Sequence, residues 1–105
     1  MDADGIHGQL DTLILATLKR GEAHGYAIIT ALREHSGERL DLPSGTVYPA
    51  LRRLERAGHV SGKWTQSSGR RRRVYAITDD GLTALDKGRQ SWLTLREVMT
   101  AVLGT

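Results

Sequence analysis

Residues 44–58 read SGTVYPALRRLERAG, and their apolar side chains recur at the spacing of an α-helix. At about 100° per residue, four of them fall within one arc roughly 100° wide and are expected to face a hydrophobic core: Val47, Ala50, Leu51 and Leu54. Ser44 is the expected N-cap and Gly58 the expected stop signal. The stretch therefore predicts a helix with one buried face.

The opposite face of this helix carries hydroxyl groups first and guanidinium groups further on. An α-helix fits the major groove of B-DNA, and helix-turn-helix proteins read base edges with the N-terminal part of their recognition helix. The base-reading candidates are Ser44, Thr46, Tyr48 and Pro49, and the candidates for guanine or phosphate are Arg52, Arg53 and Arg56. Two alternatives stay open: Tyr48 as a residue flanking the core, and Arg52 as the partner of Glu55.

Helical spacing also precedes this segment and follows it. The pattern predicts helices over about 8–19 and 24–35, and a final helix over 79–103 with Thr78 as its N-cap and Asp79 and Asp80 in its first turn. Between Gly58 and Thr78 the period changes to two, with turn residues at Gln66–Gly69, which predicts a two-stranded antiparallel hairpin.

The order helix, helix, helix, hairpin, helix is typical of a winged helix-turn-helix. We therefore expect a mainly α (α+β) fold, with a DNA-binding domain over 1–78 and a C-terminal dimerisation helix over 79–105 that belong to one compact unit. A chain of 105 residues leaves little room for two independent cores.

The basic residues are concentrated in one segment. Residues 44–78 hold eight basic side chains and one acid, a net charge of +7, whereas the rest of the chain carries −4. A basic segment in an otherwise acidic chain is typical of a polyanion binder.

Several other classes of protein are disfavoured. The chain has no cysteine, no apolar run of membrane-spanning length, and an acidic start, MDADGIHGQL, where a secretory signal would be basic. It has no Gly-rich phosphate loop, GxSxG or HExxH motif, and His7, His24, His35 and His59 show no metal-ligand spacing. We expect a cytoplasmic protein that is not an enzyme and binds no cofactor and no metal.

Three motifs resemble the PadR-like transcriptional regulators: HGYAI at 24–28, SGTVYPALRRLERAG at 44–58 and RVYAITDDG at 73–81. The similarity covers roughly residues 8–82, and the short C-terminal part resembles the small subgroup in which a single helix follows the wing. The resemblance implies a homodimeric repressor that binds a pseudo-palindromic operator and responds to a small-molecule effector.

The hairpin tip, SSGRRRR at 67–73, matches a wing that lies against the DNA minor groove. Successive strand side chains point to opposite faces, so two or three of its arginines are expected to contact DNA. The candidates on and near the hairpin are Lys63, Arg70, Arg71, Arg72 and Arg73. The resemblance places Tyr26 near the DNA backbone, although a core tyrosine is an equal alternative, and Trp64 and Tyr75 are expected to pack within the wing.

The final helix carries more apolar surface than a domain of this size can cover, so a second copy is expected to bury it. The expected dimer contacts, including two from the first helix, are Leu10, Ile14, Leu85, Trp92, Leu93, Leu95, Val98, Met99, Val102 and Leu103. Trp92 is interpreted mainly as an interface anchor. A second hypothesis places it in a ligand cavity for a flat aromatic effector.

Two functions are carried forward. The first is a sequence-specific DNA-binding repressor. The second is a winged-helix module for protein–protein interaction, which would have no need of +7 within 35 residues.

Overall fold

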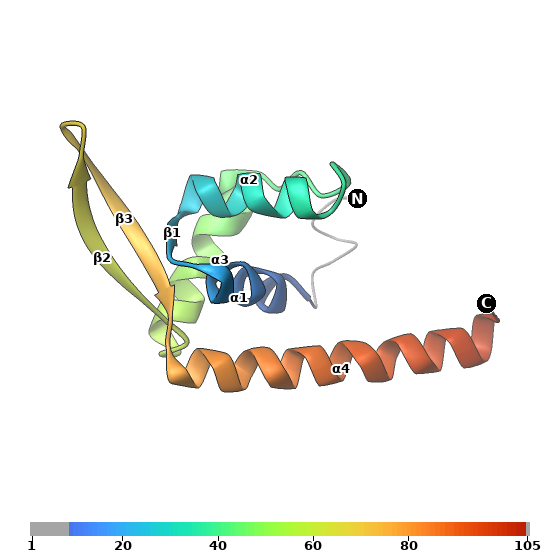
Figure 1. Cartoon of the computed structure of the whole chain (residues 1–105). Coiled ribbons are helices and arrows are strands. Elements are labelled where there is room, and N and C mark those ends of the chain that lie inside the picture. The colour runs from blue at the N-terminus through green and yellow to red at the C-terminus, as the bar shows by residue number, and fades with distance from the viewer. Residues whose placement is uncertain (1–8, 105) are drawn as a thin grey trace.

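A computed structural model describes residues 9–104, except for the side chain of Ser67, and shows the expected winged helix (Figure 1). Its helices are α1 (Leu10–Arg20), α2 (Gly25–His35), α3 (Ser44–Arg56) and α4 (Asp79–Leu103). Its strands are β1 (Ala23–His24), β2 (Val60–Ser67) and β3 (Arg70–Ile77). The acidic start and His7 lie outside the described residues.

One hydrophobic core joins the three short helices to the base of the wing. Its most deeply buried side chains come from α1, α2, α3 and α4: Ile14, Ile28, Val47, Leu51 and Leu85. Val60 and Tyr75 bring the two wing strands into the same cluster. Burying one such aliphatic side chain contributes about 1.5–3 kcal/mol, so this core fixes α3 against the other helices.

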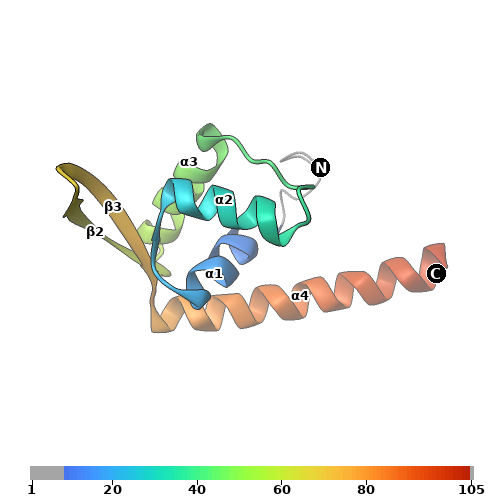
Figure 2. The same ribbon diagram turned by 45° about the horizontal axis from the view of Figure 1, so that its top comes forward.

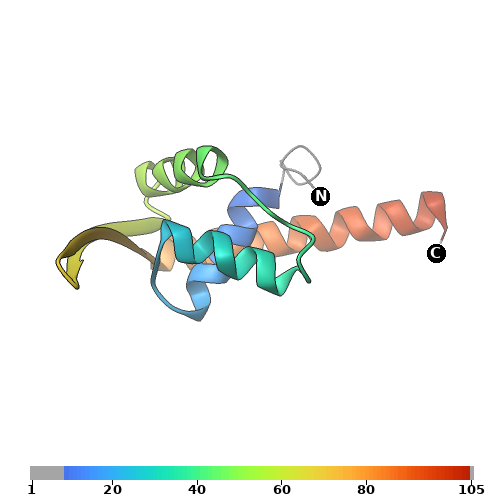
Figure 3. The ribbon, with the colours of Figure 1, turned by 90° about the horizontal axis from the view of Figure 1, so that it is seen from above.

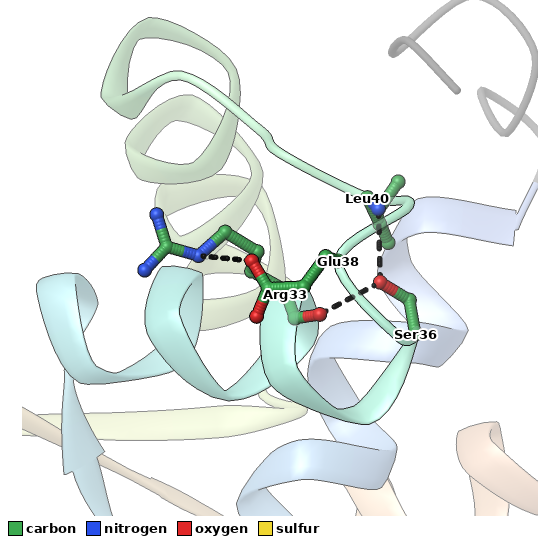
Figure 4. A network of polar contacts seen from close by, with 4 residues as sticks. All are labelled: Arg33, Ser36, Glu38 and Leu40. Atoms are coloured by element: carbon green, nitrogen blue, oxygen red, sulfur yellow. Dashed lines mark hydrogen bonds and ion pairs between the residues drawn. The ribbon is translucent and has the colours of Figure 1, made fainter.

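A compact turn connects α2 to the segment that leads to α3 (Figure 4). The Ser36 hydroxyl donates to the Arg33 carbonyl at 3.0 Å and accepts from the Leu40 amide at 2.9 Å. Arg33 also pairs with Glu38 at 3.5 Å, and Glu38 has a left-handed backbone, φ 66°. The turn directs Leu40 into the core, so the start of α3 is anchored.

The start of α3 differs from the prediction by one residue. Pro43 is the N-cap, because its carbonyl accepts hydrogen bonds from Thr46 and Val47 at 3.0 and 3.2 Å, so Ser44 is already helical. The prediction that Ser44 caps the helix is therefore wrong. Pro49 consequently lies in the second turn, where it has no N–H to donate to the Gly45 carbonyl.

The wing contains three strands rather than two. β2 and β3 pair from Val60↔Ile77 to Ser67↔Arg70, and β1 adds Ala23↔Tyr75 at the other edge of β3. A two-residue strand is too short to show a period in the sequence. The turn itself is Ser68-Gly69, both at positive φ, so Gln66 and Ser67, predicted in the turn, are strand residues.

α4 begins as predicted and extends well beyond the body of the molecule (Figures 1 and 2). The Thr78 hydroxyl accepts from the Gly81 amide at 3.0 Å, which confirms the N-cap. The first half of α4 packs on α1 so closely that a Cβ at Gly88 would lie 2.1 Å from Thr12 Oγ1. Seen from above, the second half extends away on the side opposite the wing (Figure 3).

Three residues expected at a dimer interface lie inside the single chain. Leu10, Ile14 and Leu85 are 6%, 0% and 1% exposed. α4 lies on α1, so one chain already covers these side chains and leaves almost no surface for a partner. They contribute to the core.

Candidate nucleic-acid interface

Three elements enclose a groove on one side of the molecule: the N-terminus of α2, the first turns of α3, and the wing. The groove has a volume of about 570 Å³ and is open to solvent. It is lined by His24, Gly25, Tyr26, Tyr48, Trp64, Arg70, Arg71, Arg72 and Arg73. Aromatic rings and guanidinium groups therefore dominate its lining.

The outward face of α3 is accessible over its whole length. Ser44, Tyr48 and the arginines at 52, 53 and 56 are exposed, whereas Thr46 and Pro49 are half-buried. Arg53 pairs with Asp11 of α1 at 3.0 Å, with both side chains about half exposed. Such an exposed pair contributes only about 0.2–1 kcal/mol, so it leaves Arg53 free to exchange Asp11 for a phosphate.

Two tyrosines shape the part of the groove next to α2. Tyr26 is 69% exposed, which excludes the alternative that it is a core residue. Tyr48 combines the two roles considered for it: its ring lies against Gly25, where a Cβ would come within 2.5 Å of Cε1, yet 37% of the residue is exposed. Gly25 thus allows α2 and α3 to approach each other beside the groove.

The arginines of the wing differ in their surroundings. Arg71 lies over the Trp64 ring, 4.7 Å from its centroid, and Arg72 Nη1 lies 2.8 Å from His24 Nε2. Arg70 and Lys63 are exposed. Trp64 is itself 56% exposed, so the ring supports guanidinium groups on the surface instead of filling the wing interior.

Arg73 points toward α3. Its Nη2 binds Glu55 Oε2, and its guanidinium lies 5.6 Å from the Trp64 centroid and 6.0 Å from that of Tyr75. The sequence alternative that paired Glu55 with Arg52 does not describe this structure, because Glu55 binds the wing. Both side chains of the pair are 31% exposed.

Sequence reasoning missed His24. Its Nδ1 accepts from the Ala27 amide at 3.2 Å and so caps α2, while its Nε2 meets Arg72. Its position directly before a helix was a signal that it could be an N-cap. Its contact with Arg72 could not be found in the same way, because the two residues are 48 positions apart in the sequence. Within residues 9–104 no group of three or more His, Asp or Glu side chains is arranged to hold a metal ion.

The sequence model of the Transcriptional regulator PadR-like family matches residues 14–87, which include α2, α3 and the whole wing. The chain belongs to this family. PadR-like proteins are DNA-binding winged-helix regulators of transcription and not enzymes, which confirms the class expected from the sequence.

Individual relatives agree with this assignment. The chain is 39% identical to the transcriptional regulator Rv3488 of Mycobacterium tuberculosis over 83 residues, 79% of this chain and 72% of the relative. It is 30% identical over 69 residues to the negative transcriptional regulator PadR of Bacillus subtilis, covering 65% of this chain but only 38% of that protein.

Solved structures show the same fold. A transcriptional regulator from Clostridium thermocellum superposes with a TM-score of 0.88 at 30% identity, covering 93% of this chain and 96% of that chain. A PadR family transcription regulator from Clostridium difficile gives 0.78 at 35% identity, covering 90% and 98%. The long C-terminal helix after the wing is therefore a feature shared with PadR-like regulators. No helix among the described residues is long and apolar enough to cross a membrane.

Proposed function

We propose that this PadR-like protein is a repressor that binds a pseudo-palindromic operator as a homodimer. The observation that carries the proposal is the groove between α2, α3 and the wing. It brings two tyrosines, Trp64 and the wing arginines to one surface, and α3 also carries exposed arginines. Hydroxyls and Pro49 at the start of α3 would contact base edges, and the exposed arginines of α3 and of the wing tip, Arg70 to Arg72, would hold phosphates.

The proposed dimer rests on the repeat along α4. Gly81, Leu85, Gly88, Trp92, Leu95, Met99 and Val102 are spaced alternately by four and three residues, so they share one face of the helix. The first three lie against the chain's own α1 or core. From Arg89 to Gly104 every residue is exposed, and Leu95, Met99 and Val102 are 47%, 49% and 79% accessible.

A second copy of the chain can cover this exposed half of α4, residues 89–103, because the same apolar repeat on two helices can interdigitate. Leu93, Val98 and Leu103 flank the repeat and extend the surface. Two-fold pairing would also present two α3 helices to successive major grooves, about 34 Å apart. The division of the chain into a DNA-binding domain over 1–78 and a dimerisation helix over 79–105 stays a prediction. In this proposal the first half of α4 packs in the core and the second half forms the dimer.

The sign of regulation is supported by one relative, since the Bacillus subtilis protein is a negative transcriptional regulator. Trp92 is 43% exposed and Arg96 lies 5.6 Å from its ring centroid, a position compatible with an interface anchor. We also propose that a small-molecule effector binds beside Trp92 and releases the DNA. This step is supported only by the resemblance to the PadR-like family. Cytoplasmic location likewise stays a prediction from the sequence.

Selection of bound sequences from a random duplex library tests the proposal. We expect an inverted repeat whose half-sites lie about 10 base pairs apart, centre to centre. Gel shifts with excess competitor DNA then measure the preference for that sequence. A protein-interaction module would enrich no sequence, and enrichment of a single half-site by a monomer would remove the dimer from the proposal.

A further inference from the structure

We propose that the Glu55–Arg73 ion pair holds the wing at the angle to α3 that DNA binding requires, so that Arg73 is a positioning residue and not a phosphate contact. The inference rests on the proposed DNA-binding function. It assigns to Arg73 a role different from that of Arg70, Arg71 and Arg72, although the four are adjacent in the sequence.

The strand register directs Arg73 toward α3. Gly62, Trp64, Arg73 and Tyr75 share one face of the hairpin, because Gly62 pairs with Tyr75 and Trp64 with Arg73. Tyr75 is 5% exposed and belongs to the core, so this face is turned toward the body of the molecule. Glu55 lies on α3, and its carboxylate binds the Arg73 guanidinium that extends from this face of the hairpin.

Arg73 is held on several sides at once. A Cβ on Gly62 would lie 2.9 Å from its Nε, so the glycine provides the space in which the guanidinium lies. The rings of Trp64 and Tyr75 flank it, and Glu55 takes Nη2. A planar guanidinium with aromatic neighbours and a carboxylate loses little entropy on pairing, and lysine does not replace it in such a setting.

The wing needs such a fixed point because most of it has no support from the core. From Arg70 to Arg72 the side chains are exposed, and the hairpin extends away from the helices (Figure 1). Among the ion pairs of the described residues, Glu55–Arg73 joins α3 to the wing, whereas the others join α1 to α3 or lie within one element or its adjoining turn. Without it, the arginines of the tip would keep their charge but lose their direction relative to α3.

Neutralising Glu55 distinguishes this role from simple electrostatics. Glu55 is the one acid within residues 44–78, so removing its charge should strengthen DNA binding if Coulomb repulsion alone matters. If the pair positions the wing, Glu55→Gln should instead weaken operator binding, by about fivefold or more. It should also flatten the salt dependence, although no positive charge is removed, because phosphate contacts of the wing are no longer made together.

The experiment measures operator affinity at several salt concentrations for the full-length protein, Glu55→Gln, Arg73→Lys and the exchange Glu55→Arg/Arg73→Glu. Arg73→Lys keeps the charge, so it should weaken binding only if geometry matters. The exchange keeps the net charge and should recover part of the affinity that Glu55→Gln removes. Glu34→Gln, at the far end of α2, is the matched removal of one negative charge and should leave binding unchanged or slightly stronger.

Thermal unfolding of each variant checks that it is folded at the assay temperature. If Glu55→Gln is unfolded there, the Arg73→Lys comparison decides the question. Unchanged or tighter binding by a folded Glu55→Gln overturns the inference and leaves the proposed DNA binding in place; weaker binding by Arg73→Lys in that case would make Arg73 a phosphate contact. If the unmodified protein selects no sequence and binds no duplex, the proposed function and this inference both fail.

Discussion

At the scale of single residues, three glycines allow close approaches between neighbouring elements. Gly25 accommodates the ring of Tyr48, Gly62 accommodates the guanidinium of Arg73, and Gly88 accommodates Thr12. In each case a Cβ would lie less than 3 Å from another side chain. Close packing at these points sets how α2, the wing and α4 lie relative to the rest of the chain.

Gly88→Ala tests this reasoning on stability. Alanine stabilises a helix by about 1 kcal/mol relative to glycine. At position 88, however, its Cβ would lie 2.1 Å from Thr12 Oγ1 and 3.0 Å from Thr12 Cβ and Cγ2. We expect a net loss of about 1–3 kcal/mol in the free energy of unfolding, measured by urea denaturation.

The matched control is Gly45→Ala, because Gly45 is also helical and a Cβ there would meet nothing within 4 Å. This variant should be unchanged or up to about 1 kcal/mol more stable. Thr12→Ala in the Gly88→Ala background removes Oγ1 and Cγ2 and should restore most of the stability. A Gly88→Ala protein as stable as Gly45→Ala would show that α1 and α4 do not approach as closely as described.

At the scale of elements, the wing supplies charge and α3 supplies the reading surface. Changing Arg71 and Arg72 together to alanine should weaken operator binding at low salt. Removing one arginine–phosphate interaction flattens the plot of log affinity against log salt by about 0.9, so the slope should change by roughly 1–2. Fluorescence anisotropy with a labelled duplex at several salt concentrations measures both quantities.

The control for this pair is Lys87→Ala/Arg89→Ala, which removes two positive charges from α4 instead. Its slope should match that of the unmodified protein. Equal slopes for all three proteins would mean that Arg71 and Arg72 do not contact phosphates in the complex.

At the scale of the whole molecule, the exposed half of α4 is the surface through which two copies are proposed to form a dimer. Lysines in place of Met99 and Val102 would bring charge into an apolar surface that is expected to be buried between two copies, so the dimer should dissociate. Light scattering at micromolar concentration should then give the monomer mass, while the unmodified chain gives twice that value.

Gln90→Lys/Ala101→Lys serves as the control, because these exposed positions lie on the opposite side of α4, about 160–180° from Trp92 at 100° per residue. That variant should remain dimeric. A monomeric unmodified protein at micromolar concentration would exclude the dimer. A dimeric Met99→Lys/Val102→Lys protein would move the interface away from this face.

Local patterns along the chain predicted the helices, the wing hairpin and the position of the charge. A change of period from 3.6 to 2 after Gly58 is a local signal, and so are the Thr78 cap and the segregation of apolar residues to one face of α3. The arginines of the site, Arg52 and Arg70 to Arg72, could therefore be named from the sequence, and the structure leaves them accessible. Tyr26 was placed near DNA only by the resemblance to the PadR-like family, with a core tyrosine as an equal alternative, and its exposure excludes that alternative.

The partner of each side chain, by contrast, follows from the folded arrangement of the elements and not from any local pattern. Glu55 binds Arg73 and not Arg52, His24 meets Arg72, and Ile14 and Leu85 are covered by their own chain. Such contacts depend on how elements 18 to about 70 residues apart are oriented in space. Periodicity along one element carries no information on that orientation, because it specifies which face is apolar and not what that face will touch.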